Sequence, residues 1–275
     1  MIVRVVRDAV LALGLALALA SAPAGAGASA GGSMGSAGGA ARPPVALTAS
    51  PARVDLAGAG RATVRVTNRG LQRVVVDVVR AGFALDLRGR PKIVAASAAR
   101  RSAARWLTLR PRSVVLRPGA AAPVTVAAKP PARAEPGDHD ALVLLTTRSR
   151  VTGRVAVRMR MGVVVVVRVP GAITRRLALR GVRVRERGRL RTIELVIANR
   201  GNVTESFARR GSVLVLEQRG RRIARLTAQP RTLRPGTLGV LQFRYRGPLS
   251  GPALARVDVV SESGRAIRRT MRLRL

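Results

Sequence analysis

The sequence predicts an all-β protein built from two tandem antiparallel β-sandwiches. Two observations support this fold class: apolar and polar residues alternate along several short segments, and one ordered set of strands and turns occurs twice. Turn-forming residues recur about every 8–12 positions, which is typical of the strands of a sandwich. The only stretch with helical character is 95–105, which we expect to be a loop or a short helix ahead of a strand at Trp106.

Four segments show the alternation most clearly. In each of them every second residue is apolar, so that one face of the strand is suited to a core and the other to solvent. In the last segment Ile267, Met271, Leu273 and Leu275 share one face, and arginines occupy the other. The segments are Ala62–Asn68, Val155–Met161, Thr192–Asn199 and Ala266–Leu275.

The internal repeat combines an Asn-Arg-Gly turn with a later Leu-Arg-Pro-Gly corner. Residues 68–70 precede the first corner, Leu116–Gly119, and residues 199–201 precede the second, Leu233–Gly236. An alternating strand, a Pro/Gly turn and a further strand follow each corner, so the order repeats together with the chemistry. The repeat predicts domains at 44–170 and 173–275, joined near 169–171.

Each part of the repeated turn and corner has an expected structural role. We expect the corner leucine to face the core, the proline to fix φ, and the glycine to turn the chain into the next strand. The glycines of the Asn-Arg-Gly turns, Gly70 and Gly201, are expected to supply a positive φ. The corner arginines, Arg117 and Arg234, are expected to be free to contact a partner.

The N-terminus has the features of a secretory signal peptide. Arg4 and Arg7 precede an apolar run over 9–20, and small residues follow it, with cleavage expected near Ala26 to Ala30. We therefore assign 1–26 to the signal peptide and 27–43, rich in Gly, Ala and Ser, to a flexible linker. The apolar run is shorter than the roughly 20 residues of a membrane-spanning helix, so we expect no stable transmembrane anchor, although retention as an anchor stays open. The predicted location is secreted or in the cell envelope.

The charge of the chain points to an anionic partner. Its 51 Lys and Arg against 13 Asp and Glu give a net charge of +38, and only two of the cations are Lys. Such a charge attracts anionic wall polymers or, as a peripheral contact, an anionic membrane surface. Export and an aromatic content of 2% argue against nucleic acid. Compositional bias that leaves a solvated basic surface is the competing interpretation. The candidate polymer-binding residues are Arg154, Arg158, Arg160, Arg268, Arg272 and Arg274.

The residue inventory argues against catalysis. The chain has no Cys and a single His, which excludes a Cys-His pair and zinc sites built on Cys or on several His. The one polar cluster is Glu135, Asp138, His139 and Asp140, which we interpret as an ordinary polar loop between strands and not as a cation or acid–base site. We expect a non-enzymatic protein without catalytic residues, metal or cofactor. Without Cys, its stability comes from its cores and not from disulfides.

Residues 104–147 resemble a bacterial surface immunoglobulin-like domain, the one that precedes the host-binding half of WxL-interacting proteins. A strand led by Trp106, the corner at Leu116–Gly119, a strand ending at Pro130-Pro131 and the turn Pro136–His139 follow in the order of that family. The second half is similar to the domain that follows it. The resemblance implies two immunoglobulin-like sandwiches, the first contacting a wall polymer and the second a protein. His139 stands where the family has Tyr, which leaves the ligand open.

Two functions therefore remain open. The first is an exported envelope protein that binds an anionic wall polymer, a surface protein, or both. The alternative is a periplasmic chaperone of the pilus-assembly type, which also has two immunoglobulin-like domains and would pair an exposed edge strand such as Val155–Met161 with its client. Such a chaperone would hold the client's C-terminus with basic residues between the domains, which the sequence does not single out.

Overall fold

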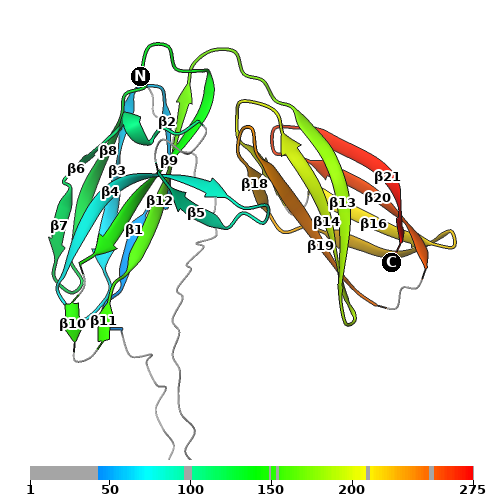
Figure 1. The fold of residues 1–275 in the computed structure, drawn as a ribbon, viewed down its shortest axis with the longest axis horizontal. Coiled ribbons are helices and arrows are strands. Elements are labelled where there is room, and N and C mark those ends of the chain that lie inside the picture. The colour runs from blue at the N-terminus through cyan, green and yellow to red at the C-terminus, as the bar shows by residue number, and fades with distance from the viewer. Residues whose placement is uncertain are drawn as a thin grey trace, which may run out of the picture.

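The computed structural model describes residues 43–95, 101–148, 150–152, 155–208, 211–247 and 251–274. The predicted signal peptide, its cleavage positions and nearly all of the predicted linker lie outside these ranges. Within them, no helix is long and apolar enough to cross a membrane. The protein is all-β, two tandem sandwiches of the immunoglobulin-like kind whose named strands pair antiparallel with one exception, which confirms the predicted fold class (Figure 1).

Two packed sheets form the first sandwich. One has the strand order β1-β3-β8-β6, and the other has the order β2-β12-β9-β4-β5 with β7 also paired to β4. A short hairpin, β10–β11, extends from it, and the 3-10 helix Ala104–Trp106 precedes β6. The strands are β1 (Leu47–Ser50), β2 (Arg53–Ala57), β3 (Gly60–Asn68), β4 (Val74–Leu85), β5 (Pro91–Val94), β6 (Leu107–Arg110), β7 (Ser113–Leu116), β8 (Ala121–Ala128), β9 (Gly137–Thr147), β10 (Arg150–Thr152), β11 (Val155–Val157) and β12 (Arg160–Val169).

The second sandwich packs a β13-β14-β19 sheet against a β17-β16-β20-β21 sheet, with a β15-β18 pair beside them. All its strands lie within 177–274, and those of the first sandwich lie within 47–169; the domain limits 44–170 and 173–275 stay predictions. The strands are β13 (Leu177–Arg187), β14 (Leu190–Asn199), β15 (Glu205–Phe207), β16 (Ser212–Gln218), β17 (Arg221–Thr227), β18 (Arg231–Leu233), β19 (Leu238–Arg246), β20 (Pro252–Val260) and β21 (Ala266–Arg274).

Each sandwich has its own core, made by the predicted alternation. Val64 and Val66 of β3 are fully buried in the first core, and Ile193, Leu195 and Ile197 of β14 are fully buried in the second. Ile267 and Leu273 of β21 are also buried, whereas the arginines between them are exposed. Leu275 lies outside the described residues. Burying one face of each strand supplies the main driving force for folding, about 25 cal/mol for each Å² of apolar surface.

The repeated motif is held together by one buried asparagine in each domain. Asn68 Nδ2 donates to the carbonyls of Gln72 and Leu116, at 2.7 and 3.2 Å, and Asn199 Nδ2 donates to those of Val203 and Leu233, at 2.8 and 3.0 Å. Each asparagine therefore ties its own turn to the leucine of the corner. This connection explains why the turn and the corner repeat together although different numbers of residues separate them.

The glycines of the repeat follow two rules, one expected and one not. The corner glycines have positive φ, +76° at Gly119 and +66° at Gly236, as the turn chemistry predicts. Gly70 and Gly201 do not, so the expectation of a positive φ there is wrong. A Cβ at Gly70 would lie 2.7 Å from the Pro44 carbonyl oxygen, and close backbone approach is the reason for glycine at both turns.

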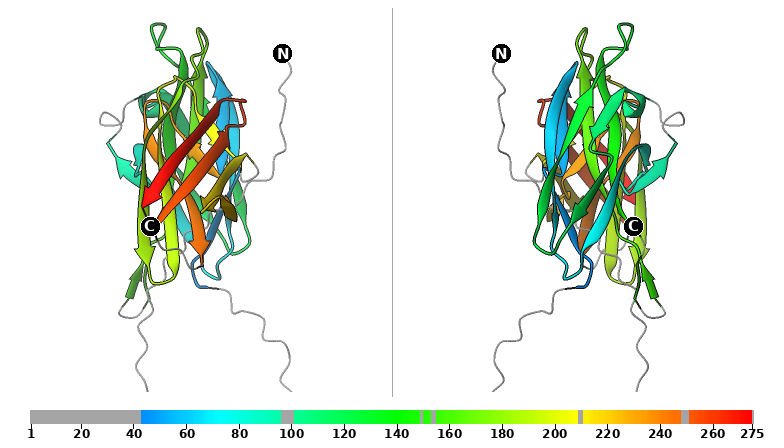
Figure 2. Two further views of the ribbon diagram at one scale, coloured as in Figure 1. Left: turned by 90° about the vertical axis from the view of Figure 1, so that its right-hand side faces the viewer. Right: turned by 90° about the vertical axis from the view of Figure 1, so that its left-hand side faces the viewer.

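The two sandwiches contact each other directly. The tip of the β4–β5 hairpin reaches toward the second sandwich (Figure 1), where the Leu87 carbonyl accepts from Val240 N–H at 2.8 Å. Arg88 of the same tip forms an ion pair with the buried Glu194 of β14 at 3.1 Å. Figure 2 shows β20 and β21 across the far side of the second sandwich, so its β13-β14-β19 sheet is the one turned toward the first.

The polar cluster of the sequence analysis forms much of this contact. Asp138, His139 and Asp140 begin strand β9 and are buried, so the expectation of an ordinary loop is wrong. Asp138 accepts from Thr204 N–H of the second sandwich at 2.7 Å and pairs with Arg168 at 2.7 Å. Burial alone would raise the pKa of Asp138, but Arg168 and the Thr204 N–H hold that pKa below its ordinary value.

Arg234 of the second corner completes the contact between the sandwiches. It forms an ion pair with Asp140, donates to the Phe83 carbonyl at 2.8 Å, and stacks over the Phe83 ring at 4.2 Å. Its exposed fraction is 8%, so the expectation that Arg234 is free for an external partner is wrong. The reason is that domain packing places an acidic strand end directly against this corner.

Candidate binding site

One edge of the first sandwich is only partly covered by a neighbouring strand. Strand β2 pairs in parallel with β12 from Val164 to Arg168, whereas β12 begins at Arg160. On the side away from β9, residues 160–163 have no paired strand within the described part of the chain. We call residues 160–163 of β12 the open edge.

The peptide groups of Arg160 and Gly162 point to the open edge. On the covered part of β12, Val164 N–H donates to the Ala52 carbonyl at 3.1 Å and the Arg168 carbonyl accepts from Gly58 N–H at 2.7 Å. Peptide groups of successive residues point to opposite sides of a strand, so even-numbered residues of β12 face away from β9. The open edge therefore presents unpaired N–H and C=O groups of the kind that another strand can join.

The ribbon of β9 and β12 continues past the sheet as the β10–β11 hairpin, which projects from the end of the first sandwich (Figure 1). Where the sheet meets the hairpin, Thr147 N–H at the end of β9 donates to the carbonyl of Met159, just before β12, at 2.9 Å. The predicted strand Val155–Met161 is thus divided between β11 and β12, with Arg158 and Met159 outside both. The backbone of β11 is paired to β10 on one side, so it extends the line of the open edge.

Side chains of opposite character lie on the two faces of the open edge. Met159 and Met161 are half-buried against the first core, and Val163 is fully buried. On the other face Arg160 is exposed, and Gly162 leaves a space: a Cβ there would lie 3.4 Å from Cδ2 of Leu142 and 3.8 Å from Cδ2 of Leu144. We call this position, where residue 162 has no side chain over Leu142 and Leu144, the notch; the positive charge of Arg160 lies on the same face.

A further cation stands at the end of the open edge. Arg53 is the first residue of β2 and lies opposite Val164, immediately past the uncovered residues. It forms an ion pair with Asp55 at 2.8 Å, and 38% of its side-chain surface is exposed to solvent. Neither Arg158 nor Arg160 forms an ion pair with any described residue, so the edge has an excess of positive charge.

Five of the six arginines named from the sequence lie in described strands or loops, and they fall into two separate places. Arg158 and Arg160 lie at the open edge, and Arg154 lies outside the described residues. Arg268 and Arg272 are exposed on β21 of the second sandwich, where Arg268 pairs with Asp258 at 3.2 Å. Arg274 ends the same strand, and its side chain is not described. The fold does not bring the two groups together.

His139 has a packing role in the structure. Its ring lies 4.5 Å from that of Trp106, and its Nε2 is 2.8 Å from the Glu135 carbonyl oxygen. Burial is the main reason that the pKa of His139 is lowered. Among the described residues, no group of three His, Cys, Asp or Glu side chains is placed to hold a metal ion.

No protein-family model and no curated protein matches this chain. Solved structures with a similar arrangement include the YadV chaperone (14% identity, TM-score 0.44, 82% of this chain and 99% of that one). A chain from a chaperone–tip adhesin complex of CFA/I fimbriae biogenesis has 12% identity and a TM-score of 0.47, and the match covers 82% of this chain and 98% of that one. The Pseudomonas aeruginosa CupB2 chaperone has 16% identity and a TM-score of 0.42, and the match covers 83% of this chain and 100% of that one. The identities and TM-scores are low, so none of these similarities transfers a function.

Proposed function

We propose that this protein binds an extended segment of a partner polypeptide by adding it as a strand to the open edge of β12. This is the chaperone-type function that the sequence left open as the alternative to wall-polymer binding. The observation that supports it is the outward direction of the peptide groups of Arg160 and Gly162, with no strand beside them in the described chain. Strand addition takes its affinity from such main-chain groups and its specificity from pockets for alternate side chains.

The notch at Gly162 selects one side chain of the partner. A strand added beside β12 places a residue next to Gly162 on the face that carries Leu142 and Leu144. The missing side chain of Gly162 leaves room there for a large apolar residue, which would contact both leucines. We therefore expect partner segments to carry one bulky apolar residue at this position.

Arg53 gives the bound segment a direction. Strand β2 runs parallel to β12, and an added strand of the same direction would lie in line with β2 and end beside Arg53. An arginine placed there can receive the C-terminal carboxylate of the segment, because guanidinium and carboxylate pair through two hydrogen bonds. Asp55 competes for the same guanidinium, so the carboxylate would share Arg53 with it.

The test compares two substitutions at one residue. Gly162→Pro removes the N–H that points to the open edge and leaves the pairing of Met161 and Val163 with β9 in place. Gly162→Ala keeps that N–H and adds a methyl group at an ordinary contact distance from Leu142. The probe is a displayed library of random twelve-residue peptides with free C-termini, from which uncharged binders are selected and measured by fluorescence anisotropy.

We expect Gly162→Pro to weaken the selected peptides at least tenfold more than Gly162→Ala does, because both substitutions add a side chain in the notch and only proline also removes the N–H. Both variants should unfold at temperatures close to that of the unmodified protein, since neither loses a described hydrogen bond. Equal binding by the proline variant would contradict strand addition at this edge. Hydrogen exchange gives a second readout: the amides of Arg160 and Gly162 should exchange fast in the free protein and become protected when a peptide binds.

Binding of an anionic wall polymer, the other function suggested by the sequence, stays a prediction, as do the exported location and the absence of catalysis. Sedimentation with purified cell wall at low salt, and release at high salt, would test that binding.

A further inference from the structure

The sheet of the second sandwich that faces the first carries arginines in two rows. The registers place Arg187, Leu190 and Arg246 side by side across β13, β14 and β19, and Arg185, Thr192 and Arg244 in the adjacent row. Directly opposed residues point to the same face of a sheet, so all six side chains lie on one face. Arg183 of β13 extends the row of arginines by one more step and lies opposite Glu194.

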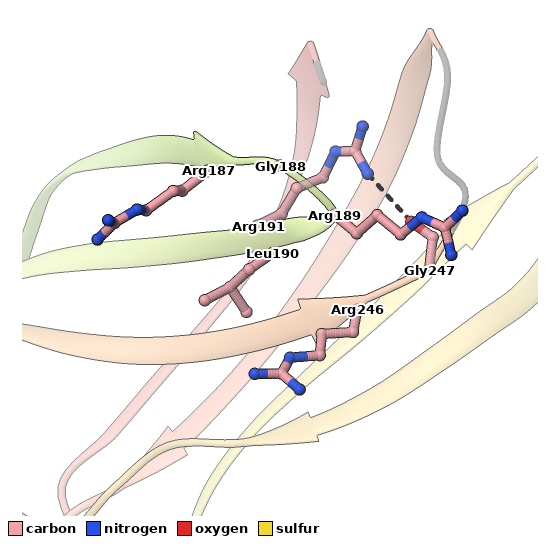
Figure 3. A pocket seen from close by; sticks show the side chains of 7 residues that line it. All are labelled: Arg187, Gly188, Arg189, Leu190, Arg191, Arg246 and Gly247. Atoms are coloured by element: carbon pink, nitrogen blue, oxygen red, sulfur yellow. Dashed lines mark hydrogen bonds between the residues drawn. The ribbon is translucent and has the colours of Figure 1, made fainter. Parts of the chain in front are cut away.

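Figure 3 shows one end of this face. The side chains of Arg187, Leu190 and Arg246 extend to one side of the sheet, whereas the Arg191 guanidinium turns to the other, where it donates to the Gly247 carbonyl at 3.0 Å. The residues around the β13–β14 turn and the end of β19 line a half-open hollow of about 1020 Å³. Its charged lining consists of arginines.

The positive charge of this face is largely uncompensated. Glu194 is its one acidic residue, and it is already held by Arg88, Arg185 and Gln242 at 3.1, 3.2 and 2.9 Å. Arg183, Arg187, Arg244 and Arg246 are exposed and form no ion pair with a described residue. Five arginines and one glutamate leave a net of four positive charges on one sheet face.

The spacing of the arginines suits a folded acidic surface. One strand, β14, lies between the β13 arginines and those of β19, so two interstrand spacings separate them by about 10 Å, and successive arginines along a strand are about 7 Å apart. The less polar strip of Leu190 and Thr192 runs between them, so a partner can place carboxylates at both margins and uncharged side chains in the middle. Arginine is the cation best suited to this task, because its fork matches a carboxylate and its guanidinium is weakly hydrated.

We infer that the outer face of the β13-β14-β19 sheet is a docking surface for an acidic region of a polypeptide partner, the same partner whose extended segment joins β12. The identity of the partner as a polypeptide rests on the proposed function. The position of the face supports the connection, since this sheet is turned toward the first sandwich. We call this outer face, with Arg183, Arg185, Arg187, Arg244 and Arg246, the arginine face. The open edge would then bind one segment of the partner while the arginine face binds its folded acidic surface.

The experiment uses a fluorescein-labelled peptide of ten glutamates and the full protein. The double variant Arg187→Glu/Arg246→Glu should weaken its binding at least tenfold. The control, Arg221→Glu/Arg222→Glu, makes the same change in net charge on exposed positions of β17 in the same domain and should weaken it less than threefold. A loss of equal size in the two variants would show attraction by the overall charge of +38 and overturn the inference.

Two further arms separate the alternatives. Linear polyphosphate with ten phosphates should compete no better than the glutamate peptide; competition at a tenfold lower concentration would assign the face to a phosphate polymer and overturn the polypeptide partner. Gly162→Pro should leave the binding of the glutamate peptide unchanged. The uncharged peptides that test the open edge should in turn be insensitive to Arg187→Glu/Arg246→Glu, so either proposal can fail without the other.

Discussion

The two Leu-Arg-Pro-Gly corners have the same sequence and the same hydrogen bonds, and they differ in what surrounds them. In both, the corner glycine N–H donates to the carbonyl of the buried asparagine at 2.9 Å, and that asparagine donates to the carbonyl of the corner leucine. Arg117 of the first corner is exposed, whereas Arg234 of the second is buried against Asp140 and Phe83.

This difference separates two kinds of information in one motif. The asparagine, leucine and glycine act within a single sandwich, so their roles repeat wherever the motif repeats. The arginine points out of the sandwich, so its role depends on what the other domain places beside it. A repeated motif in this protein is therefore good evidence of fold and weak evidence of a binding site.

The sharpest way to test the comparison is to remove each corner arginine. Arg234→Ala should reduce the free energy of unfolding by about 3–5 kcal/mol, because it leaves the Asp140 carboxylate buried without its cation. Arg117→Ala, on an exposed side chain, should change it by less than about 0.5 kcal/mol. Chemical denaturation of both variants measures the difference, and similar losses would show that the corners are equivalent after all.

The asparagines should behave alike, in contrast to the arginines. Asn68→Ala and Asn199→Ala each remove an amide that donates to two carbonyls and accepts from one glycine N–H, which should cost about 2–3 kcal/mol in either domain, although Gly70 N–H keeps its bond to the Ala46 carbonyl at 3.2 Å. Denaturant unfolding followed by hydrogen exchange of each domain would locate the loss. A much larger effect in one domain would mean that the repeat is not structurally equivalent.

The smallest expected effect concerns pH and the contact between the domains. The pKa of Asp138 in the folded protein lies below its ordinary value of 3.8, so its stabilising effect is complete above that value and is lost as the pH falls through the lower, folded pKa. Asp138→Asn should therefore reduce stability at neutral pH by about 1 kcal/mol, since Arg168 is partly exposed.

The same variant should also show a shallower loss of stability below pH 3.8 than the unmodified protein. Thermal unfolding at a series of pH values would measure this slope. Asp258→Asn, which removes the exposed partner of Arg268, serves as the control for the loss of one carboxylate. An unchanged slope in Asp138→Asn would contradict the role given to Asp138.

Much of the fold could be predicted because its determinants are local. Alternation along segments such as Ala62–Asn68 and Thr192–Asn199 is set by which face of each strand is buried, and the structure confirms those faces. The glycines of the Asn-Arg-Gly turns show the limit of this reasoning. Gly70 is required by the approach of the Pro44 backbone, and that contact comes from a segment whose position no local pattern reveals.

Only part of the candidate site could be predicted from the sequence. The segment around Met159 and Met161 could be recognised as an alternating strand, but its open edge exists because β2 begins to pair with β12 only at Val164. The arginine face could not be predicted from the sequence because its residues come from β13 and β19, and Arg244 and Arg246 lie more than fifty residues from Arg187. The only available signal was the alternation of arginine along 183–187.

By itself, the sequence determined the all-β fold and the internal duplication, because strand alternation and turn chemistry act between residues that are close in the chain or repeat with it. Only the tertiary structure decided which groups are free and which are used. It joined Arg234 to Asp140 across the two domains, left the peptide groups of Arg160 and Gly162 at an uncovered edge, and gathered arginines of two strands on one face. Burial and strand pairing are properties of the packed chain, and the charge of a residue does not reveal them.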